Sequence, residues 1–343
     1  MSAQADVGYH ARQHARWHWG EIAFWIAALG CAFVFPSRYL IMTDIVRLAL
    51  FALSLDLILG YAGIVSLGHA AFFGVGAYGA GLLALHGIVT EPVIALVAAG
   101  LAAMVLGFLT SFLVIRGVDL TRLMVTLGIA LLLEALAERF SDITGGTDGL
   151  QGIEMQPILG LFAFDMFGRI GFFYSLAVLF LLFLLARRIV LSPFGLSLRA
   201  IRNNPLRAAA IGIPVNQRLI AIYTLAAFYA GIAGALFTQT TALASLDVFA
   251  FERSADLMLV LVIGGTGYLY GGLIGAVVFR MLQEVFSTLT PQYWQFWIGL
   301  VLVVIVLVGR KRLHRWVLWA PNLLITLFAG RKAAVAIPES DAP

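Results

Sequence analysis

Residues Arg187–Arg218 read RRIVLSPFGLSLRAIRNNPLRAAAIGIPVNQR and form a polar island between two long apolar segments. The island contains six arginines and no aspartate or glutamate. Short basic loops between membrane-spanning helices stay in the cytoplasm, so this stretch orients the helices around it. We expect Leu196–Ile211 to form short helices that break near Pro205 and end at Gly212. A basic helix at the membrane face suits docking to a cytoplasmic partner, and plain positive-inside anchoring is the alternative.

The composition is that of a helical membrane protein. Of the 343 residues, 62% are hydrophobic and 12% are charged, whereas soluble domains are about half apolar and about a quarter charged. We therefore predict an all-α, polytopic membrane protein with about eight to ten membrane segments. Glycine-rich stretches within it predict that some of these segments are broken or re-entrant.

Apolar runs divide the chain into an N-terminal segment (1–20), one membrane domain (21–310) and a C-terminal tail (311–343). The expected spans are Glu21–Phe35, Ile41–Leu59, Gly60–Leu85, Pro92–Ile115, Thr121–Ala137, Gly171–Ala186, Leu219–Phe237, Ala255–Phe286 and Phe296–Val308. Because arginine-rich ends stay inside, we expect both termini and the loop 187–218 in the cytoplasm. The acidic loop 141–169 is then external.

The long apolar segment Ala255–Phe286 conflicts with that orientation if it is one helix. A single crossing would place the basic cluster Arg310–Arg315 outside. The conflict disappears if the segment enters the membrane, breaks at IGGTGYLYGGLIG (Ile263–Gly275) and returns to the same side. Broken backbone is tolerated at depth only where protein buries it or it lines a wet cavity, so we favour a break over one long tilted helix. The candidates for a translocation path here are Gly264, Gly265, Thr266 and Gly267.

A second glycine-rich stretch, GYAGIVSLGHAAFFGVGAYGAG (Gly60–Gly81), carries polar side chains within an apolar run. Small residues let helices approach closely and also permit unwound backbone. Polar groups at depth normally face a path or a partner. The candidates for the translocation path here are Gly63, Ser66, Gly68 and His69. Tight helix packing, with His69 hydrogen-bonded to neighbouring backbone, is the alternative.

A third polar cluster, SDITGGTDGLQG at Ser141–Gly152, has the composition of an external turn. It could contact an external partner or an arriving substrate, and a solvated loop is the alternative. The candidate residues are Gly145, Gly146, Thr147, Asp148 and Gly149.

Several kinds of chemistry are excluded by the residues themselves. The only lysines, Lys311 and Lys332, each follow an arginine, so no Gly-Lys-Ser/Thr phosphate loop is present. H-E-x-x-H, G-x-S-x-G and Cys/His metal spacings are also missing, and Cys31 is the single cysteine. We expect no catalytic residue, metal or cofactor in this chain. The arginines lie at helix ends without interleaved aromatic side chains, which argues against a nucleic-acid partner.

Four motifs, taken in order, resemble the permease subunits of bacterial ATP-binding-cassette importers for branched-chain amino acids, the LivM type. The motifs are LSLDLILGYAGIVSLGHAAFFGVGAYGAG (Leu53–Gly81), TGGTDGLQGI (Thr144–Ile153), SPFGLSLRAIRNNPLRAAAIGIPV (Ser192–Val215) and VIGGTGYLYGGLIGA (Val262–Ala276). The resemblance extends from about Ile41 to Arg310 and implies the permease fold of these importers.

The resemblance further implies a subunit of the bacterial inner membrane that does not hydrolyse ATP. Its partners would be a second homologous permease, two ATPase subunits that use ATP and magnesium, and a periplasmic substrate-binding protein. The polar island would couple the chain to the ATPases. The residues this assigns to coupling are Leu198, Arg199, Ala200, Arg202, Asn203, Ala209 and Gly212. Family members often have an acidic residue where this chain has Pro205, so a contact from that carboxylate is not expected.

Other functions remain open on the sequence. Urea and short-amide permeases share these motifs, so the substrate is not fixed. A stand-alone secondary transporter would need coupling carboxylates at mid-membrane, and Asp56 is the main candidate. An intramembrane enzyme is the least supported class because its motifs are missing.

Overall fold

The computed structural model describes residues 19–165 and 167–308, and within them all regular elements are helical. These elements are α2 (Trp19–Val34), α3 (Tyr39–Asp56), the π-helical turn η1 (Leu57–Tyr61), α4 (Ala70–Leu85), α5 (Pro92–Arg116), α6 (Asp119–Arg139), α7 (Ser141–Thr144), the 3-10 turn η2 (Gly146–Asp148), α8 (Arg169–Val190), α9 (Pro193–Asn203), α10 (Pro205–Ala210), α11 (Val215–Thr241), the 3-10 turn η3 (Leu246–Phe249), α12 (Phe251–Gly264), α13 (Leu269–Leu289) and α14 (Trp294–Val308).

The helices confirm the predicted multi-pass membrane fold. Among the described residues, five helices are long and apolar enough to cross a membrane: α5, α6, α8, α11 and α13. Three shorter helices, α2, α4 and α14, are also apolar. The 18-residue helix α3 carries Asp44, Arg47 and Asp56 in an otherwise apolar sequence.

Helix α11 forms the centre of the helix packing. In the most apolar 18-residue stretch of α11, 78% of the residues are buried, whereas the corresponding stretch of α6 has only 17% buried. Helix α11 is therefore an interior helix and α6 a peripheral one. The closest neighbours of α11 are α4 and α5. A Cβ atom on Gly76 would overlap the backbone of Gly231, and one on Gly234 would overlap the carbonyl group of Phe73. The small residues of α4 and α11 therefore serve close packing.

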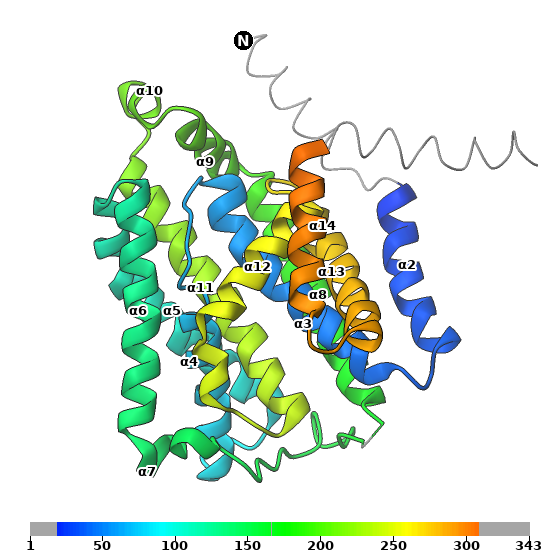
Figure 1. Ribbon diagram of the computed structural model, residues 1–343. Helices are drawn as coiled ribbons and strands as arrows, with labels where there is room; N and C mark the ends of the chain where they lie inside the picture. Colours follow the sequence, from blue (N-terminus) through cyan, green and yellow to red (C-terminus); the bar gives the residue numbers. More distant parts are fainter. Residues whose placement is uncertain (1–18, 166, 309–343) are drawn as a thin grey trace, which may run out of the picture. The chain divides into compact units, whose positions relative to one another are not determined.

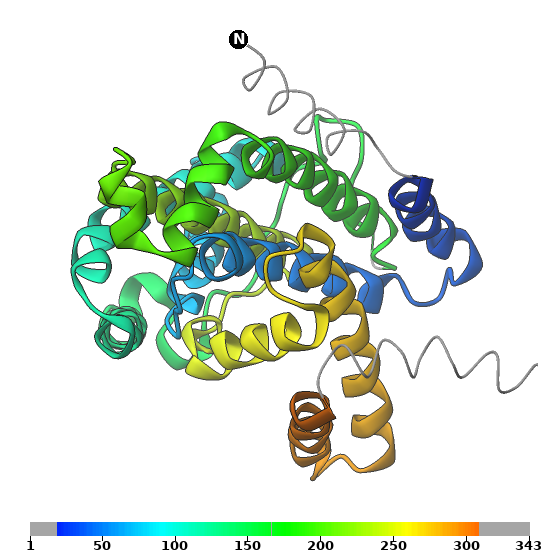
Figure 2. The same ribbon diagram turned by 90° about the horizontal axis from the view of Figure 1, so that it is seen from above.

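The polar island lies at one end of these helices. Figure 1 shows α9 and α10 at the end opposite α7, as expected if the loops 187–218 and 141–169 lie on different sides of a membrane. Viewed along the bundle in Figure 2, α3 runs between α8 on one side and α12 on the other. This places α3 where it can connect the two ends.

The island folds as predicted, although its ends are helical. Helix α8 continues to Val190 and α11 already begins at Val215. The connection contains two short helices separated at Asn204, whose Oδ1 accepts a hydrogen bond of 2.9 Å from the Arg207 amide. Pro205 occupies the first position of α10, where its missing N–H group leaves no helical bond unmade.

The break predicted within Ala255–Phe286 is confirmed, and the single long helix is wrong. Helix α12 has 14 residues and is therefore only about 21 Å long. The chain then turns at residues 265–268 and runs back as α13 (Figure 1). A Cβ atom on Gly275 would lie 3.0 Å from the amide nitrogen of Gly264, so the two helices pack as a close antiparallel hairpin. Gly267 has φ +81°, a conformation that favours glycine at the turn.

The chain divides into two compact units after Arg280. The smaller unit begins at Met281 and contains the end of α13 and α14, where the rings of Phe286 and Trp297 stack with centroids 6.3 Å apart. The tail assigned to 311–343 lies outside the described residues, as does the segment 1–18.

We expect Gly76→Ala to destabilise the protein, because the added methyl group must push α4 away from the backbone of α11. Overpacking of this kind costs about 1–3 kcal/mol. Gly128→Ala in α6 is the matched control, because nothing lies within 4 Å of its Cβ position. Thermal unfolding in detergent micelles checks this. Equal midpoints for the two variants would contradict the packing argument.

The hairpin predicts which membrane face its turn reaches. We expect a cysteine at Tyr268 to react with impermeant thiol reagents from the same face as a cysteine at Leu206 in α10, because the turn lies beside α9. A cysteine at Leu243 should react from the opposite face. Cys31→Ser provides the background without a native thiol. Labelling of Tyr268→Cys together with Leu243→Cys would refute this arrangement.

Candidate functional site

Helix α3 does not continue directly into α4. It widens into the π-helical turn η1 and then into an irregular stretch that ends at His69. A π-helical turn shifts the backbone hydrogen bonds by one residue and often marks a functional site. Irregular backbone among membrane helices must find its hydrogen-bond partners within the protein.

Side chains from neighbouring helices provide these partners. Thr126 Oγ1 in α6 accepts a hydrogen bond of 3.2 Å from the amide of Leu67. Ser254 Oγ in α12 accepts one of 2.9 Å from the amide of Ala70, at the start of α4. The irregular stretch is thus held on two sides by different helices.

Helix α9 holds the same region through Arg202. The guanidinium Nη1 of Arg202 donates a hydrogen bond to the carbonyl oxygen of Gly60 in η1. A Cβ atom on Gly63 would lie 3.1 Å from Arg202 Cγ, so the aliphatic part of this side chain covers Gly63. The neighbouring guanidinium of Arg199 lies over the ring of Tyr61, 5.4 Å from its centroid, which adds a cation–π contact.

The turn between α12 and α13 meets η1 at this point. Asp56 Oδ1, fully buried at the end of α3, accepts a hydrogen bond of 2.7 Å from the amide of Gly267. A Cβ atom on Gly267 would lie 3.0 Å from Arg202 Nη1. The two broken segments predicted from glycine content therefore touch each other and the polar island. We call the group Asp56, Gly60, Arg202 and Gly267 the junction.

The other path candidates lie inside the protein. Ser66 and His69 are fully buried. His69 Nε2 lies 2.8 Å from Ser54 Oγ, and its ring stacks on Phe51 with centroids 5.7 Å apart. Gly68 packs against the backbone of α6. In this conformation these residues pack between helices, and the hydrogen-bond partner of His69 is a side chain instead of the expected backbone group.

The coupling candidates divide into buried and exposed residues. Leu198 is fully buried and fixes α9 to the bundle, and Ala200 is half-buried. Arg199, Arg202, Asn203, Ala209 and Gly212 are exposed. Sequence reasoning missed two apolar residues on this surface, Leu206 at 83% exposure and Ile211 at 70%. They could have been found from the sequence, because Leu206 and Ile211 are large apolar residues within an otherwise polar island.

The side chains of four of the six island arginines make contacts within the described part of the chain. Besides Arg199 and Arg202, Arg187 pairs with Glu21 in α2 at 2.8 Å. Arg218 lies over the ring of Phe194 at 5.1 Å. Positive-inside anchoring alone would not require any of these contacts, so the island has a structural role as well.

The glycines of the cluster Ser141–Gly152 shape this loop. Leu150 exchanges two backbone hydrogen bonds with Ala244, of 2.7 and 3.1 Å, and a Cβ atom on Gly149 would overlap the Ala244 carbonyl oxygen. Gly145 and Gly146 both have positive φ. Gly145, Thr147 and Asp148 are exposed, and the side chains of Thr147 and Asp148 remain available to a partner. In the described part of the chain, no three His, Cys, Asp or Glu side chains gather as they would around a metal.

These features define a class of protein: a multi-pass helical membrane subunit whose basic loop is joined to broken segments, as in membrane transport proteins. The family model described as "Branched-chain amino acid transport system / permease component" matches residues 37–306, and the chain belongs to this family. The description of this family names its members as permease components of a transport system.

Curated relatives carry out related transport with different named solutes. The chain is 26% identical over 277 residues to the high-affinity branched-chain amino acid permease LivM of Escherichia coli (strain K12), covering 74% of this chain and 64% of that protein. The chain thus spans less than two thirds of this relative. It is 32% identical over 173 residues to the ribose import permease RbsC of Bacillus subtilis (strain 168), covering 46% and 53% of the two chains.

A third relative is the autoinducer 2 import permease LsrC of Salmonella choleraesuis (strain SC-B67), 27% identical over 305 residues, with 84% and 85% coverage. No solved structure matches the chain. The names of these relatives refer to branched-chain amino acids, ribose and autoinducer 2, so family membership leaves the substrate open.

We expect Asp56→Ala to loosen the turn at residues 265–268, because the amide of Gly267 loses its acceptor. An unsatisfied buried donor costs about 1–3 kcal/mol. Hydrogen exchange of that segment should accelerate about tenfold. Asp142→Ala, an exposed carboxylate in α7, is the control. Unchanged exchange in Asp56→Ala would contradict the role of this bond.

Proposed function

We propose that this chain is the translocation subunit of an ATP-driven importer for branched-chain amino acids. In this proposal it lies in the bacterial inner membrane with α9 and α10 on the cytoplasmic side. It works with a second homologous permease, two ATPase subunits and a periplasmic binding protein. The observation that carries the proposal is the hydrogen bond from Arg202 to Gly60, because it joins the polar island to η1, and Asp56 beside η1 accepts a hydrogen bond from the second broken segment at Gly267.

Docking to the ATPase subunits is assigned to the outer surface of α9 and α10. Leu206 and Ile211 expose large apolar side chains there, beside the exposed guanidinium of Arg207. Buried apolar anchors surrounded by polar groups are typical of protein interfaces. ATP and magnesium are used by the partner subunits, and this chain supplies no residue to that chemistry.

The junction would convert movement of α9 into movement of the path. When an ATPase displaces α9, Arg202 is pulled from the Gly60 carbonyl oxygen. A buried acceptor left without a donor costs about 1–3 kcal/mol, so η1 must rearrange or follow α9. Because Asp56 is bonded to Gly267, the turn between α12 and α13 is drawn into the same rearrangement.

The family description and the LivM relatives support branched-chain amino acids as the substrate. A urea or short-amide importer is the second candidate, because its permeases share the same motifs. A stand-alone secondary transporter gains no support, since Asp56 is bonded to the Gly267 amide within the junction.

We expect Leu206→Asp and Arg202→Glu to fail in different ways. Leu206→Asp should reduce co-purification of the ATPase subunits, because a charge replaces an apolar anchor. Arg202→Glu, and more weakly Arg199→Glu, should retain the ATPases but lower uptake per ATP hydrolysed about tenfold. Co-purification from native membranes and uptake by proteoliposomes that contain the full complex measure both.

Arg188→Glu is the matched control, because Arg188 is exposed at the end of α8 and is not part of the junction. It should leave assembly and coupling unchanged. Wild-type coupling in Arg202→Glu would refute the role of the junction. Recovery of the chain without any ATPase, together with uptake that needs no ATP, would refute the importer.

A further inference from the structure

The loop between η2 and α8 carries an apolar turn at the end of the helices opposite α9 (Figure 1). Its residues, Pro157–Phe164, read PILGLFAF and include no charged or hydrogen-bonding side chain. Leu159, Leu161 and Phe162 are 70%, 78% and 57% exposed. Large apolar side chains exposed together in one short segment mark a contact with a protein or with a membrane. We call Pro157–Phe164 the apolar turn.

The backbone of the apolar turn is bonded within the protein. Ile158 exchanges two backbone hydrogen bonds with Phe162, of 2.8 and 3.2 Å. The amide of Leu159 donates one of 3.3 Å to Glu91 Oε1. Two more amides donate to carbonyl oxygens of the turn itself: Gly160 to Pro157, and Leu161 to Ile158. Five consecutive amides are thus paired, which backbone in water does not need and backbone that enters apolar surroundings does.

Leu159 has a backbone conformation that leucine rarely adopts. Its φ is +52° and that of Gly160 is +72°, the two left-handed conformations of a tight hairpin turn. Asparagine, aspartate or glycine is usual at the first of these positions, because a bulky side chain is strained there. Packing within the protein offsets little of this strain, since the Leu159 side chain points outward. An apolar contact outside the protein would offset it.

The apolar turn lies at the level where two membrane helices begin. Glu91, which binds the Leu159 amide, also caps α5 by accepting a bond of 2.7 Å from the amide of Ile94. The ring of Phe164 meets that of Tyr174 in α8 edge-on, with centroids 6.1 Å apart. The exposed apolar surface of α5 starts at the same level with Ile94 and continues along the helix. The apolar turn therefore extends the apolar outer surface of a membrane-crossing helix.

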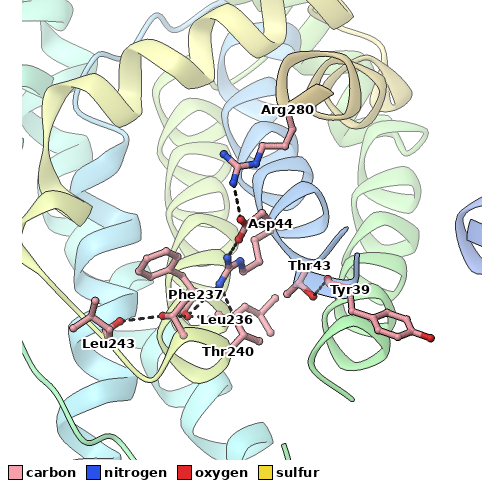
Figure 3. Close-up of polar contacts among 10 residues, drawn as sticks. Tyr39, Thr43, Asp44, Leu236, Phe237, Thr240, Leu243 and Arg280 are labelled. Carbon is pink, nitrogen blue, oxygen red and sulfur yellow. Dashed lines mark hydrogen bonds and ion pairs between the residues drawn. The ribbon is translucent and has the colours of Figure 1, made fainter. Parts of the chain in front are cut away.

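Charged side chains at this end of the helices are engaged within the protein. Asp44 is paired with Arg47 and accepts a bond of 2.8 Å from Arg280 (Figure 3). Directly after the turn, Asp165 Oδ1 accepts one of 3.0 Å from a backbone amide at the start of α8. Protein interfaces surround apolar anchors with polar groups that bond to the partner. A turn that offers only apolar side chains fits lipid chains better.

We propose that the apolar turn is a lipid anchor, which inserts Leu159, Leu161 and Phe162 into the bilayer leaflet at the end opposite α9. Interfacial anchors of this kind reach about 5–10 Å into the boundary between headgroups and acyl chains. The anchor fixes the loop to the bilayer and, through Glu91, also fixes the first turn of α5. This inference goes beyond the proposed function, because it concerns lipid binding and holds for any transported solute.

A nitroxide label in the apolar turn tests the proposal. Leu161→Cys in a Cys31→Ser background provides a single labelling site. The complete permease–ATPase complex is placed in nanodiscs of phosphatidylcholine and phosphatidylglycerol, and power saturation measures collisions of the label with oxygen and with a water-soluble nickel chelate. Oxygen should dominate at Leu161, because it concentrates among acyl chains. Glu154→Cys, exposed in the same loop but outside the turn, is the control, at which nickel should dominate.

A charge at the tip should withdraw the turn from the lipid. With the label moved to Leu159→Cys, Leu161→Asp should raise collisions with nickel to the level of the Glu154 control, because an aspartate is costly among acyl chains. Leu161→Met keeps the tip apolar and should leave oxygen dominant. Equal nickel accessibility in the Asp and Met variants would contradict insertion of the tip.

Two results with the Leu161 label would overturn the anchor in different ways. Nickel accessibility equal to that of the Glu154 control would make the apolar turn a solvated loop. Shielding of the label from both reagents would show that protein covers the turn: the other permease if the shielding is permanent, or the binding protein if it appears only when that protein is added. Oxygen accessibility that persists when the binding protein is added supports the anchor. None of these results depends on uptake, so the importer proposal stands or falls separately.

Discussion

The hydrogen bond from Arg202 to the carbonyl oxygen of Gly60 is the contact on which the rest of this structure depends. Two segments of the chain leave regular helical geometry among apolar helices, and backbone groups cannot remain unpaired there. The protein satisfies them with side chains from other helices: Arg202 for η1, Asp56 for the turn after α12, and Ser254 for the start of α4. The broken segments can therefore change shape only if these helices move with them.

Close backbone packing provides the rigid frame around this adjustable part. Helix α11 is buried between α4 and α5, where Gly76, Gly231 and Gly234 leave no room for side chains. Such packing resists deformation because a shift of one helix immediately meets the backbone of the next. Movement is thus directed to the junction, where contacts are polar, and away from the glycine-packed centre.

Helix α3 connects the two ends of the molecule. Its first turns carry Asp44 and Arg47, and its last residue, Asp56, accepts a hydrogen bond from the turn after α12. Asp44 and Asp56 are twelve positions apart in this helix, a rise of about 18 Å. A rigid helix with a charged group at each end can pass a displacement from one end of the bundle to the other.

The sequence by itself determined the helical membrane class, most helix positions, the break at Ile263–Gly275 and the family. These follow from hydropathy, arginine placement and glycine and proline spacing, which are local properties of the chain. Only the tertiary structure decided that Arg202 donates a hydrogen bond to Gly60 and that Asp56 accepts one from Gly267. It also decided that Leu198 is buried while Leu206 is exposed. It also joined Asp44 and Arg47 to Arg280, more than 200 residues away in the chain. Partners of this kind depend on which helices become neighbours, and neighbours are selected by the packing of small residues across the whole bundle.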